Sequence, residues 1–502
     1  MIKKILIIFI LSVIFSHKII AQYIYPKREL RGAWIATVAN IDWPKTPFES
    51  SGQKISELNA IFDSLKAAGI NTVYFQVRTE CDALYKSSYE PWSYWLTGEQ
   101  GKAPNPFFDP LALAISEAHR RGIEIQAWLN PYRAVKKVGE YKIAGSHISK
   151  THPKWILNFK TYKMLNPGIP AVRHYIAKIV ADIVRRYDVD GIHFDDYFYP
   201  YSPHITNQDA AAFRMYKGKF NNIDNWRRNN INQMIAEVYH TIKSIKPKVQ
   251  FGVGPFGIVE NKFAGTKGYE SYKENYCDPL SWIKSKTVDY VTPLIYWAIG
   301  NYNANYAKLL PWWSSVIDGR RLFIGIFSSK MASPEYKGNP SELENEIRLS
   351  RQMINVSGSA FFSAKSITEN YSHFADSLKL YYKYPALIPT MPWIDSTAPL
   401  PPTNLSAAGD SSAVILRWNK PALASDGDSA YHYVIYRFNQ QNDIDMDDAT
   451  HILQITADSK NYFIDSSADA SNYSHVYLVT SLDRMNNESK AAIVIYSPKK
   501  NN

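Results

Sequence analysis

Two adjacent aspartates, Asp195 and Asp196, are the residues of this sequence best suited to chemistry. They lie in the segment 189–200, VDGIHFDDYFYP. Strand alternation puts His193, Asp195 and Tyr197 on one face, and Asp196 on the other, where the strand gives way to a loop. Neighbouring carboxylates can hold different pKa values, so that one is protonated and the other ionised near neutral pH. The segment therefore predicts an acid/base pair, with both aspartates as catalytic candidates.

The same residues also have a structural interpretation. Asp195 and Asp196 can cap the following helix or pair with Arg78 or Arg133. His193 is explained equally well as a buried, hydrogen-bonded histidine. It would make a metal site only with further ligands, and the other histidines show no HxxxH or HxH spacing. The sequence therefore predicts no metal and no cofactor.

The elements that must position these residues follow from hydrophobic periodicity. Eight short apolar runs, separated by helix-length amphipathic segments, predict strands at 31–37, 71–77, 123–129, 191–197, 249–256, 290–297, 322–327 and 359–364. Several are almost continuously apolar, as parallel strands buried on both faces are. Gly69 and Gly122 end the helices before the second and third strands. The alternation predicts an α/β fold, a (β/α)8 TIM barrel over residues 22–384. A doubly wound sheet would need a glycine-rich phosphate turn, and none is present.

Such a barrel carries its functional residues at the carboxyl ends of its strands. Glycoside hydrolysis needs a proton donor and a second carboxylate, while amides, arginines and flat rings bind sugars. The residues at these ends include all three kinds and predict a carbohydrate cleft around Asp195 and Asp196. The expected substrate-binding residues are Asp42, Trp43, Arg78, Glu80, Trp128, Asn130, Arg133, His193, Tyr197, Tyr296 and Trp297.

Six segments together carry a resemblance to a known family. They are RGAW (31–34), FQVR (75–78), WLNPYR (128–133), DGIHFDDYFYP (190–200), PFGI (255–258) and DYVTPLIYW (289–297). Over residues 28–380 the chain resembles glycosyl-hydrolase-like family ten, a bacterial envelope family of barrels. That family includes enzymes that cleave peptidoglycan glycan strands stripped of their stem peptides. The resemblance implies a glycosidase fold and a polysaccharide substrate.

A weaker similarity links DGIHFDDY to the chitinase motif DGxDxDxE. It aligns Asp195 with the last Asp of that motif, His193 with an Asp, and Tyr197 with the Glu that serves as the acid. The chitinase acid therefore has no counterpart here, and Asp196 or Glu80 would have to donate the proton. The segment around Glu80 departs from the family pattern, which favours Asp196.

The composition changes after the barrel. Residues 385–402 contain six prolines and predict a stiff, extended linker. Beyond it, residues 403–498 alternate in short runs at 413–418, 431–437, 462–465 and 475–482, which predicts an immunoglobulin-like sandwich. This part resembles a fibronectin type III module, and we expect it to act as a spacer or to dock the protein on the cell wall.

The first 21 residues predict export. Lys3 and Lys4 precede an apolar run over residues 5–15, which is typical of a cleaved signal peptide and too short for a membrane span. Removing it lowers the net charge from +11 to +8, an excess suited to an anionic envelope or an acidic glycan. No compact Lys/Arg run indicates nucleic-acid binding. The mature protein is expected in the periplasm, on the outer surface or in the medium, without an integral span.

Two further features limit the alternatives. The only cysteines, Cys81 and Cys277, both follow predicted strands, and two buried free thiols are favoured over a disulfide. No GxSxG elbow is present, which argues against a serine esterase. Three hypotheses follow: an exported glycosidase acting on an envelope polysaccharide, a non-catalytic glycan-binding or adhesion protein on a decayed barrel, and a metal-dependent de-N-acetylase.

Overall fold

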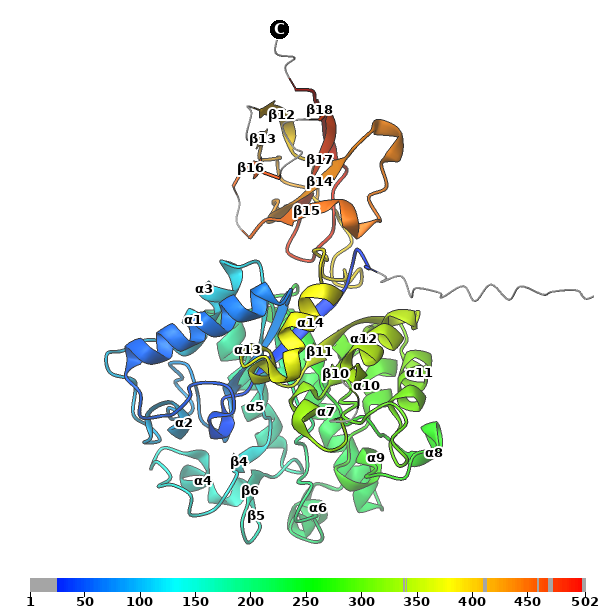
Figure 1. The fold of residues 1–502 in the computed structure, drawn as a ribbon. Coiled ribbons are helices and arrows are strands. Elements are labelled where there is room, and N and C mark those ends of the chain that lie inside the picture. Colours follow the sequence, from blue (N-terminus) through cyan, green and yellow to red (C-terminus); the bar gives the residue numbers. More distant parts are fainter. Residues whose placement is uncertain are drawn as a thin grey trace, which may run out of the picture.

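Eight parallel strands close into a barrel in the computed structural model of the chain (Figure 1). The structure describes residues 25–336, 339, 341–409, 413–457, 460–467 and 473–498, so the expected signal peptide at 1–21 lies outside the described residues. The strand order around the barrel is β1-β11-β10-β9-β8-β7-β3-β2. The bounds are β1 Leu30–Ile35, β2 Thr72–Arg78, β3 Glu124–Leu129, β7 Gly191–Phe194, β8 Gln250–Val253, β9 Tyr290–Val291, β10 Arg321–Ile326 and β11 Val356–Phe361.

This barrel confirms the predicted fold class, and each of the eight apolar runs overlaps one of its strands. The runs at 191–197, 249–256 and 290–297 were too long. The last of them supplies only the two-residue β9, and Pro293, which has no N–H to donate, follows soon after. Beyond that proline, Leu294 continues the sheet through single bridges to Phe256 and Gly325.

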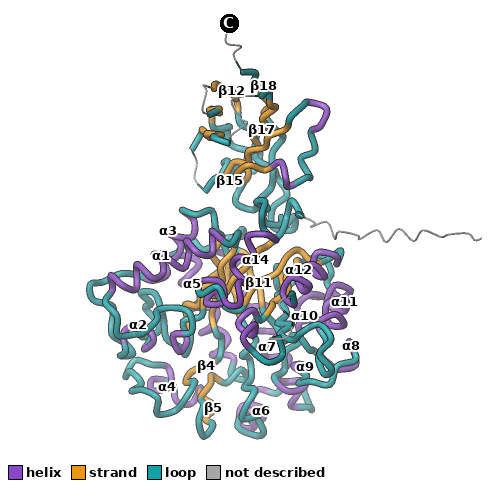
Figure 2. The backbone as a smooth tube through the Cα atoms, in the orientation of Figure 1, coloured by secondary structure: helices purple, strands orange, loops and turns teal. Residues whose placement is uncertain are grey.

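Helices surround the barrel, as Figure 2 shows. The helices between successive strands, and those after the last strand, are α1 Ser51–Ala67, α3 Pro110–His119, α5 Pro170–Arg186, α7 Ile223–Ile245, α10 Pro279–Ser285, α11 Tyr306–Val316, α12 Glu342–Gln352, α13 Ala364–Thr368 and α14 Phe374–Tyr381. Several begin at a sequence-encoded cap. The Ser50 side chain accepts a hydrogen bond from the Gln53 backbone, and the Gln53 side chain accepts one from the Ser50 backbone, so a capping box begins α1.

A small antiparallel sheet is inserted after β3. It consists of β4 Arg133–Val135, β6 Lys163–Leu165 and β5 Ile156–Asn158, in that order across the sheet. This insertion and the short helices of neighbouring loops lie at the end of the barrel farthest from the C-terminal domain (Figure 1). The short helices are α2 Tyr94–Thr97, α4 Ile148–Thr151, α6 Ala210–Tyr216, α8 Asn261–Ala264 and α9 Ser271–Glu274. Because β4 begins at Arg133, the insertion fixes the backbone of a predicted substrate-binding residue.

Large aromatic side chains fill the inside of the barrel. Trp34, Tyr74, Trp128 and Tyr290 form one buried cluster there with smaller apolar residues. Gly252 in β8 makes room for this packing, because a Cβ at this position would lie 2.0 Å from the Tyr290 ring. The interior is therefore a packed core and not a pore.

Two antiparallel sheets form the C-terminal domain. One contains β12 Thr403–Gly409, β13 Val414–Asn419 and β16 Tyr462–Asp465, and the other contains β15 Ile452–Ile455, β14 His432–Phe438, β17 His475–Leu482 and β18 Ala492–Tyr496. Trp418, Tyr433 and Tyr477 belong to the apolar cluster between them. All four predicted strands are present, and β12, β15 and β18 are additional. The domain is all-β as expected, and the fibronectin type III resemblance stays a prediction.

The proline-rich segment is packed against the barrel instead of standing free. Met391 from this segment and Met485 from the loop between β17 and β18 are 1% and 2% exposed, within the cluster that contains Leu30 and Trp34. They therefore close the amino-terminal end of the barrel, which we call the barrel floor. Proline content predicted a stiff spacer. It does not indicate whether the apolar residues between the prolines pack against another part of the protein. No helix in the described part of the chain has the length and apolar character needed to cross a bilayer.

Candidate active site

Asp195 and Asp196 directly follow β7, at the carboxyl end of the barrel. Arg484 of the C-terminal domain pairs with Asp190, which precedes the same strand, so the two aspartates lie at the end opposite to that domain (Figure 1). Their exposed fractions are 6% and 3%. Strand β7 is fixed from both sides by β3 and β8. A rigid strand therefore presents two nearly dehydrated carboxyl groups where barrels of this type carry out chemistry.

The Asp195 carboxylate is held by three donors. The Trp128 indole donates to Oδ2 at 2.9 Å, the Asn130 side-chain amide donates to the same oxygen, and the Tyr197 backbone N–H donates to Oδ1 at 3.2 Å. Burial raises the pKa of Asp195 to about 6, while Arg133 and these hydrogen bonds limit the rise. Asp195 is thus oriented by neighbours that favour its ionised form.

Asn130 is itself oriented by two further side chains. Its amide oxygen accepts hydrogen bonds from Gln76 at 2.7 Å and from Arg133 at 2.5 Å. This leaves the Asn130 nitrogen to point at Asp195, so the amide orientation follows from the network. The Arg133 guanidinium also lies 5.0 Å from the centre of the Tyr197 ring. Residues from three successive strand ends therefore converge on one carboxylate.

Asp196 has a different environment. The Tyr201 hydroxyl donates to its Oδ2, and the Asn275 side chain donates to its backbone carbonyl at 3.1 Å. Burial, and then the negative charge of Asp195, raise the pKa of Asp196 to about 7. Of the two carboxyl groups, Asp196 is thus the one whose ionisation is opposed both by burial and by the charge of its neighbour.

His193 lies below the pair, inside the barrel. Trp34 donates its indole N–H to Nε2 at 3.3 Å, which leaves Nδ1 as the protonated nitrogen facing the Tyr290 hydroxyl at 3.1 Å. Burial lowers the pKa of His193 to about 3. His193 is therefore a neutral core histidine with a hydrogen-bond partner at each ring nitrogen. This is the structural one of the two interpretations that the sequence left open. Its expected contact with substrate is not supported by this geometry.

Aromatic residues border the carboxylates. Tyr197 is 37% exposed, and the charges of Asp196 and Asp195 add to burial in raising the pKa of Tyr296. The Tyr296 ring packs 4.9 Å from Phe327 and 6.0 Å from Phe362, measured between ring centres. Trp297 lies farther along, with its ring 5.3 Å from Phe256. Besides Trp128, which donates to Asp195, Tyr197 and Tyr296 are thus the predicted aromatic residues near the acids.

Three predicted substrate-binding residues are buried in the scaffold. Trp43 is 0% exposed and donates its indole N–H to the Lys54 carbonyl at 2.9 Å. Arg78 is 1% exposed, pairs with Glu90 at 2.6 Å and donates to the Asn130 carbonyl at 2.5 Å. These contacts leave Trp43 and Arg78 no surface for a sugar. The error arose because a strand end was equated with an exposed side chain.

Glu80 is the third of these residues. It is 0% exposed and accepts hydrogen bonds from the Trp95 indole and the Tyr141 hydroxyl, both at 2.9 Å. Burial, and then the charge of Asp82, raise its pKa. Its carboxylate stabilises the loop between β2 and α3. It shares no hydrogen-bond donor with Asp195.

Asp42 is only partly buried and joins two elements at the rim. It accepts hydrogen bonds from the Ala36 N–H at 2.7 Å, the Ser363 hydroxyl at 2.7 Å and the Lys365 N–H at 2.8 Å. Burial raises its pKa to about 6. Asp42 therefore connects the loop after β1 to the start of α13, a structural role that the sequence pattern did not indicate.

Several residues that shape the site were missed in the sequence. Gln76 ends a strand-like run and was recognisable by position, but nothing local indicated that it would orient Asn130. Tyr201, Asn275, Phe327 and Phe362 reach the site from loops or from distant strands. The contact between Tyr201 and Asp196 lies within one loop, whereas the contacts of Asn275, Phe327 and Phe362 depend on the closed barrel and have no signal in the local sequence.

Other groups with reactive side chains lie outside this site. Cys81 and Cys277 are both buried and free, which confirms the favoured prediction and shows the disulfide alternative to be wrong. One cluster of acids in the described residues has metal-like spacing, formed by Asp395, Asp426 and Asp428. The Lys248 ammonium occupies it, 2.7 Å from Asp395.

Comparison with known proteins identifies the family. The family model described as glycosyl hydrolase-like 10 matches residues 29–341, which includes β7 and both aspartates. The chain belongs to this family. It is 39% identical over 486 residues to the glycosyl hydrolase YngK of Bacillus subtilis (strain 168), covering 93% of this chain and 92% of that protein. It is 38% identical over 363 residues to the glycosyl hydrolase DigH of Escherichia coli (strain K12), covering 66% and 82%.

Membership in the glycosyl hydrolase-like 10 family supports a hydrolase that acts on a glycan. The glycoside hydrolase domain of PgaB (BpsB) from Bordetella bronchiseptica matches 70% of this chain and 98% of its own, with a TM-score of 0.44 and 11% identity. The catalytic domain of a Paenibacillus polymyxa beta-amylase matches 71% and 98%, with a TM-score of 0.46 and 10% identity.

Proposed function

We propose that this protein is an exported glycosidase that cleaves a polysaccharide of the cell envelope by carboxylate acid/base catalysis. The observation that carries the proposal is a pair of adjacent buried carboxyl groups at the carboxyl end of the barrel: three hydrogen-bond donors hold Asp195, while burial and the charge of Asp195 raise the pKa of Asp196. Glycoside cleavage needs one protonated and one ionised carboxyl group at the same pH.

Each group has a role that follows from its contacts. Asp196 keeps its proton longer and donates it to the glycosidic oxygen as the bond breaks. Asp195, fixed by the donors from Trp128 and Asn130, remains ionised and stabilises the positive charge that develops on the sugar ring. A water molecule then adds to the anomeric carbon, and the proton it loses restores the acid. Tyr197 and Tyr296 offer ring faces beside them.

The substrate and location come from sequence features. The family resemblance favours peptidoglycan glycan strands, and the net charge of +8 expected after loss of residues 1–21 suits an acidic glycan. Amino-terminal sequencing of the mature protein from cell fractions tests the export step. A chain that begins at Gln22 outside the cytoplasm supports it, and an intact Met1 in the cytoplasm contradicts it.

The decisive experiment is hydrolysis by Asp195→Asn. Purified protein is incubated with stem-peptide-free glycan strands, intact sacculi and unrelated polysaccharides, and products are measured by mass spectrometry. We expect Asp195→Asn to lower the rate of chain shortening by at least about a thousandfold while circular dichroism stays unchanged. The matched control is Asp318→Asn, which alters an aspartate whose side chain is 79% exposed, and it should cleave like the wild type.

Other results would favour the other hypotheses. Retention of a glycan by the wild-type protein without any shortening indicates a binding protein on an inactive barrel. Acetate release that stops with a chelator, with chain length unchanged, indicates a metal-dependent de-N-acetylase. Equal cleavage by Asp195→Asn and wild type removes Asp195 from the mechanism.

A further inference from the structure

The Tyr201 side chain contacts the carboxyl group of Asp196 from the loop between β7 and α6. Its hydroxyl donates a hydrogen bond to Oδ2 of Asp196, and no other side chain of the described residues hydrogen-bonds to this carboxyl group. Asp195 differs, because the side chains of Trp128 and Asn130 both donate to it. The side-chain contribution to the orientation of the Asp196 carboxyl group therefore comes from one hydroxyl.

The Tyr201 ring is held in place by aromatic packing from three segments. Between ring centres, it lies 5.4 Å from Tyr197 in its own loop and 5.8 Å from Phe256 in the loop after β8. It also lies 5.0 Å from Tyr269, in the segment between α8 and α9. Close packing on several sides limits the rotamers that a ring can adopt. The hydroxyl therefore stays where it meets Asp196.

This contact distinguishes the two oxygens of the Asp196 carboxyl group. Burial, and then the charge of Asp196, raise the pKa of Tyr201 well above its usual value, so the Tyr201 hydroxyl keeps its proton and is the donor. In a protonated carboxyl group the carbonyl oxygen accepts hydrogen bonds and the O–H oxygen donates one. Oδ2 is therefore the carbonyl oxygen when Asp196 is protonated, and the proton lies on Oδ1.

The same hydrogen bond favours the ionised form of Asp196. A carboxylate is a stronger acceptor than a neutral carboxyl group, so the donor from Tyr201 lowers the pKa of Asp196 against the larger effect of burial. The contact therefore strengthens as Asp196 gives up its proton. An interaction that grows along the proton transfer lowers the barrier to that transfer.

We propose that Tyr201 is a positioning residue for the hydrolysis: it keeps the proton of Asp196 on Oδ1, from which it passes to the glycosidic oxygen, and it stabilises the carboxylate that remains. The electron pair of the breaking C–O bond goes to the glycosidic oxygen, and the water that adds to the anomeric carbon returns a proton to Asp196. Tyr201 itself neither gains nor loses a proton. This role rests on the proposed function, because it requires Asp196 to be the acid.

The neighbours of Asp196 allow the contact to be tested by its pH dependence. Among the described residues, the titratable groups that interact with Asp196 are Asp195, Tyr197, Tyr201, Tyr269, Cys277 and Tyr296. Burial raises the pKa of each of these tyrosines and of the cysteine, so they stay neutral up to pH 9. Arg133, which interacts with Asp195, stays charged throughout. Of these groups, Asp195 is therefore the one that changes charge in the same pH range as Asp196.

Tyr201→Phe removes the hydroxyl and keeps the ring. Initial rates on stem-peptide-free glycan strands are measured between pH 4 and pH 9. We expect kcat to fall at least about tenfold with KM unchanged, because the hydroxyl contacts the acid and not the sugar. The alkaline limb, set by ionisation of Asp196, should move up by about one pH unit or more, while the acid limb, set by Asp195, stays in place. A variant that only disturbs packing would not move one limb alone.

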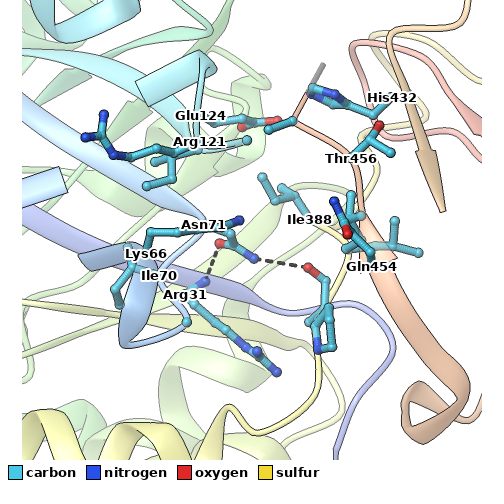
Figure 3. Close-up of a pocket in the computed structure, with 18 of the residues that line it drawn as sticks. Arg31, Lys66, Ile70, Asn71, Arg121, Glu124, Ile388, His432, Gln454 and Thr456 are labelled. Carbon is cyan, nitrogen blue, oxygen red and sulfur yellow. Dashed lines mark hydrogen bonds between the residues drawn. The ribbon is translucent and has the colours of Figure 1, made fainter. Parts of the chain in front are cut away.

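Two control variants separate the hydroxyl from other effects. Tyr269→Phe is the matched control, because Tyr269 packs against the same ring and its hydroxyl has no hydrogen-bond partner among the described residues. It should leave the alkaline limb in place. Gln454→Ala is the remote control. Gln454 lines the cavity between the barrel floor and the C-terminal domain, at the end of the barrel opposite to Asp196 (Figure 3). This variant should match the wild type in rate and in pH dependence.

The ionisation of Asp196 can also be followed without a substrate. Carbon-13 NMR of protein labelled at the aspartate carboxyl carbons gives the two midpoints of the Asp195–Asp196 pair, assigned by comparison with Asp196→Asn. We expect the higher midpoint to rise by about one pH unit or more in Tyr201→Phe and to stay unchanged in Tyr269→Phe.

Each failure has its own signature. Equal midpoints in Tyr201→Phe and the wild type overturn the proposal, and so does an alkaline limb that Tyr201→Phe leaves in place or that Tyr269→Phe moves as far. Absence of hydrolysis by the wild type overturns the glycosidase assignment, and with it the role of Tyr201 in the reaction. The NMR midpoints and the hydrolysis assay therefore distinguish a failure of Tyr201 from a failure of the proposed function.

Discussion

The two aspartates must titrate as a pair, and this sets the pH range in which the protein can work. Cleavage requires ionised Asp195, with a pKa of about 6, and protonated Asp196, with a pKa of about 7. We expect kcat/KM to fall below about pH 6 and above about pH 7, with both limits belonging to the coupled pair. Initial rates on soluble glycan strands between pH 4 and pH 9 measure this. A rate that stays constant up to pH 9 contradicts Asp196 as the acid.

Asp196 should also lower the stability of the protein at high pH. Its pKa is about 7 in the folded state and 3.8 as a free group, so folding opposes its ionisation. The folded state therefore loses stability as the pH rises from about 4 to about 7, and the loss is complete above that range. Asp196→Asn removes this loss, and we expect a gain on the order of 1–4 kcal/mol at pH 8 relative to pH 4.

Urea unfolding of both proteins at the two pH values gives that difference. The comparison across pH cancels any fixed cost of placing an amide at this position. If the unfolding free energies of variant and wild type differ by the same amount at pH 4 and pH 8, folding does not raise the pKa of Asp196.

At this scale the sequence predicts the acids but not their surroundings. Asp195, Asn130 and Arg133 were identified because acids, amides and arginines at strand ends can bind sugars, and they do meet. Trp43 and Glu80 have the same residue types at equivalent positions, yet their polar groups bond to other partners: Trp43 to the Lys54 carbonyl, and Glu80 to Trp95 and Tyr141. The difference depends on side-chain packing in loops that contact each other only after the barrel has closed.

The strands themselves were more predictable than the segments that join them. A continuous apolar run marks a strand buried on both faces, and that pattern is local. The sheet of β4, β5 and β6 was missed because its three-residue strands are too short to show alternation. Its contribution is to hold Arg133, through pairing with Met164.

Strand β8 offers a test of the packed interior. Gly252→Ala would place a methyl group 2.0 Å from the Tyr290 ring, whose hydroxyl faces His193. Because the barrel core is closely packed and has no room for the methyl group, we expect a loss of about 2–4 kcal/mol in unfolding free energy. Urea denaturation measures it.

A matched glycine provides the control. Gly52 lies in α1, and a methyl group added there would have no neighbouring atom within 4 Å, so Gly52→Ala should leave stability unchanged or raise it by up to about 1 kcal/mol. If both glycine variants unfold at the same urea concentration, the barrel interior around Gly252 can accept a methyl group, and it is packed less closely than the distance to Tyr290 indicates.

For the whole molecule, the C-terminal domain is expected to be part of the stability of the barrel. Met485→Ala removes a side chain that is 2% exposed in the barrel floor, and we expect a loss of about 2–4 kcal/mol. Met215→Ala, at a methionine that is 72% exposed, should change little. Thermal unfolding of both variants tests this. Two separate transitions, with only the smaller one shifted by Met485→Ala, would show that the two parts fold independently.

The sequence identified both parts of the chain but not the contact between them. Proline content predicted a spacer because it describes the stiffness of a free chain. Docking depends on single residues, such as Met391 in the segment and Arg484 with its partners Asp188 and Asp190. Such long-range pairs leave no periodic pattern in either segment.

The position of Met485 has a consequence for biosynthesis. The chain is made from its amino terminus, so all eight barrel strands exist before the loop that covers their floor has been translated. A nascent barrel, whose floor Met391 covers only in part, therefore keeps some apolar surface uncovered until the loop after β17 emerges, and that surface is open to chaperones and proteases. A prematurely terminated product would keep it permanently, which gives quality-control machinery a direct way to recognise incomplete chains.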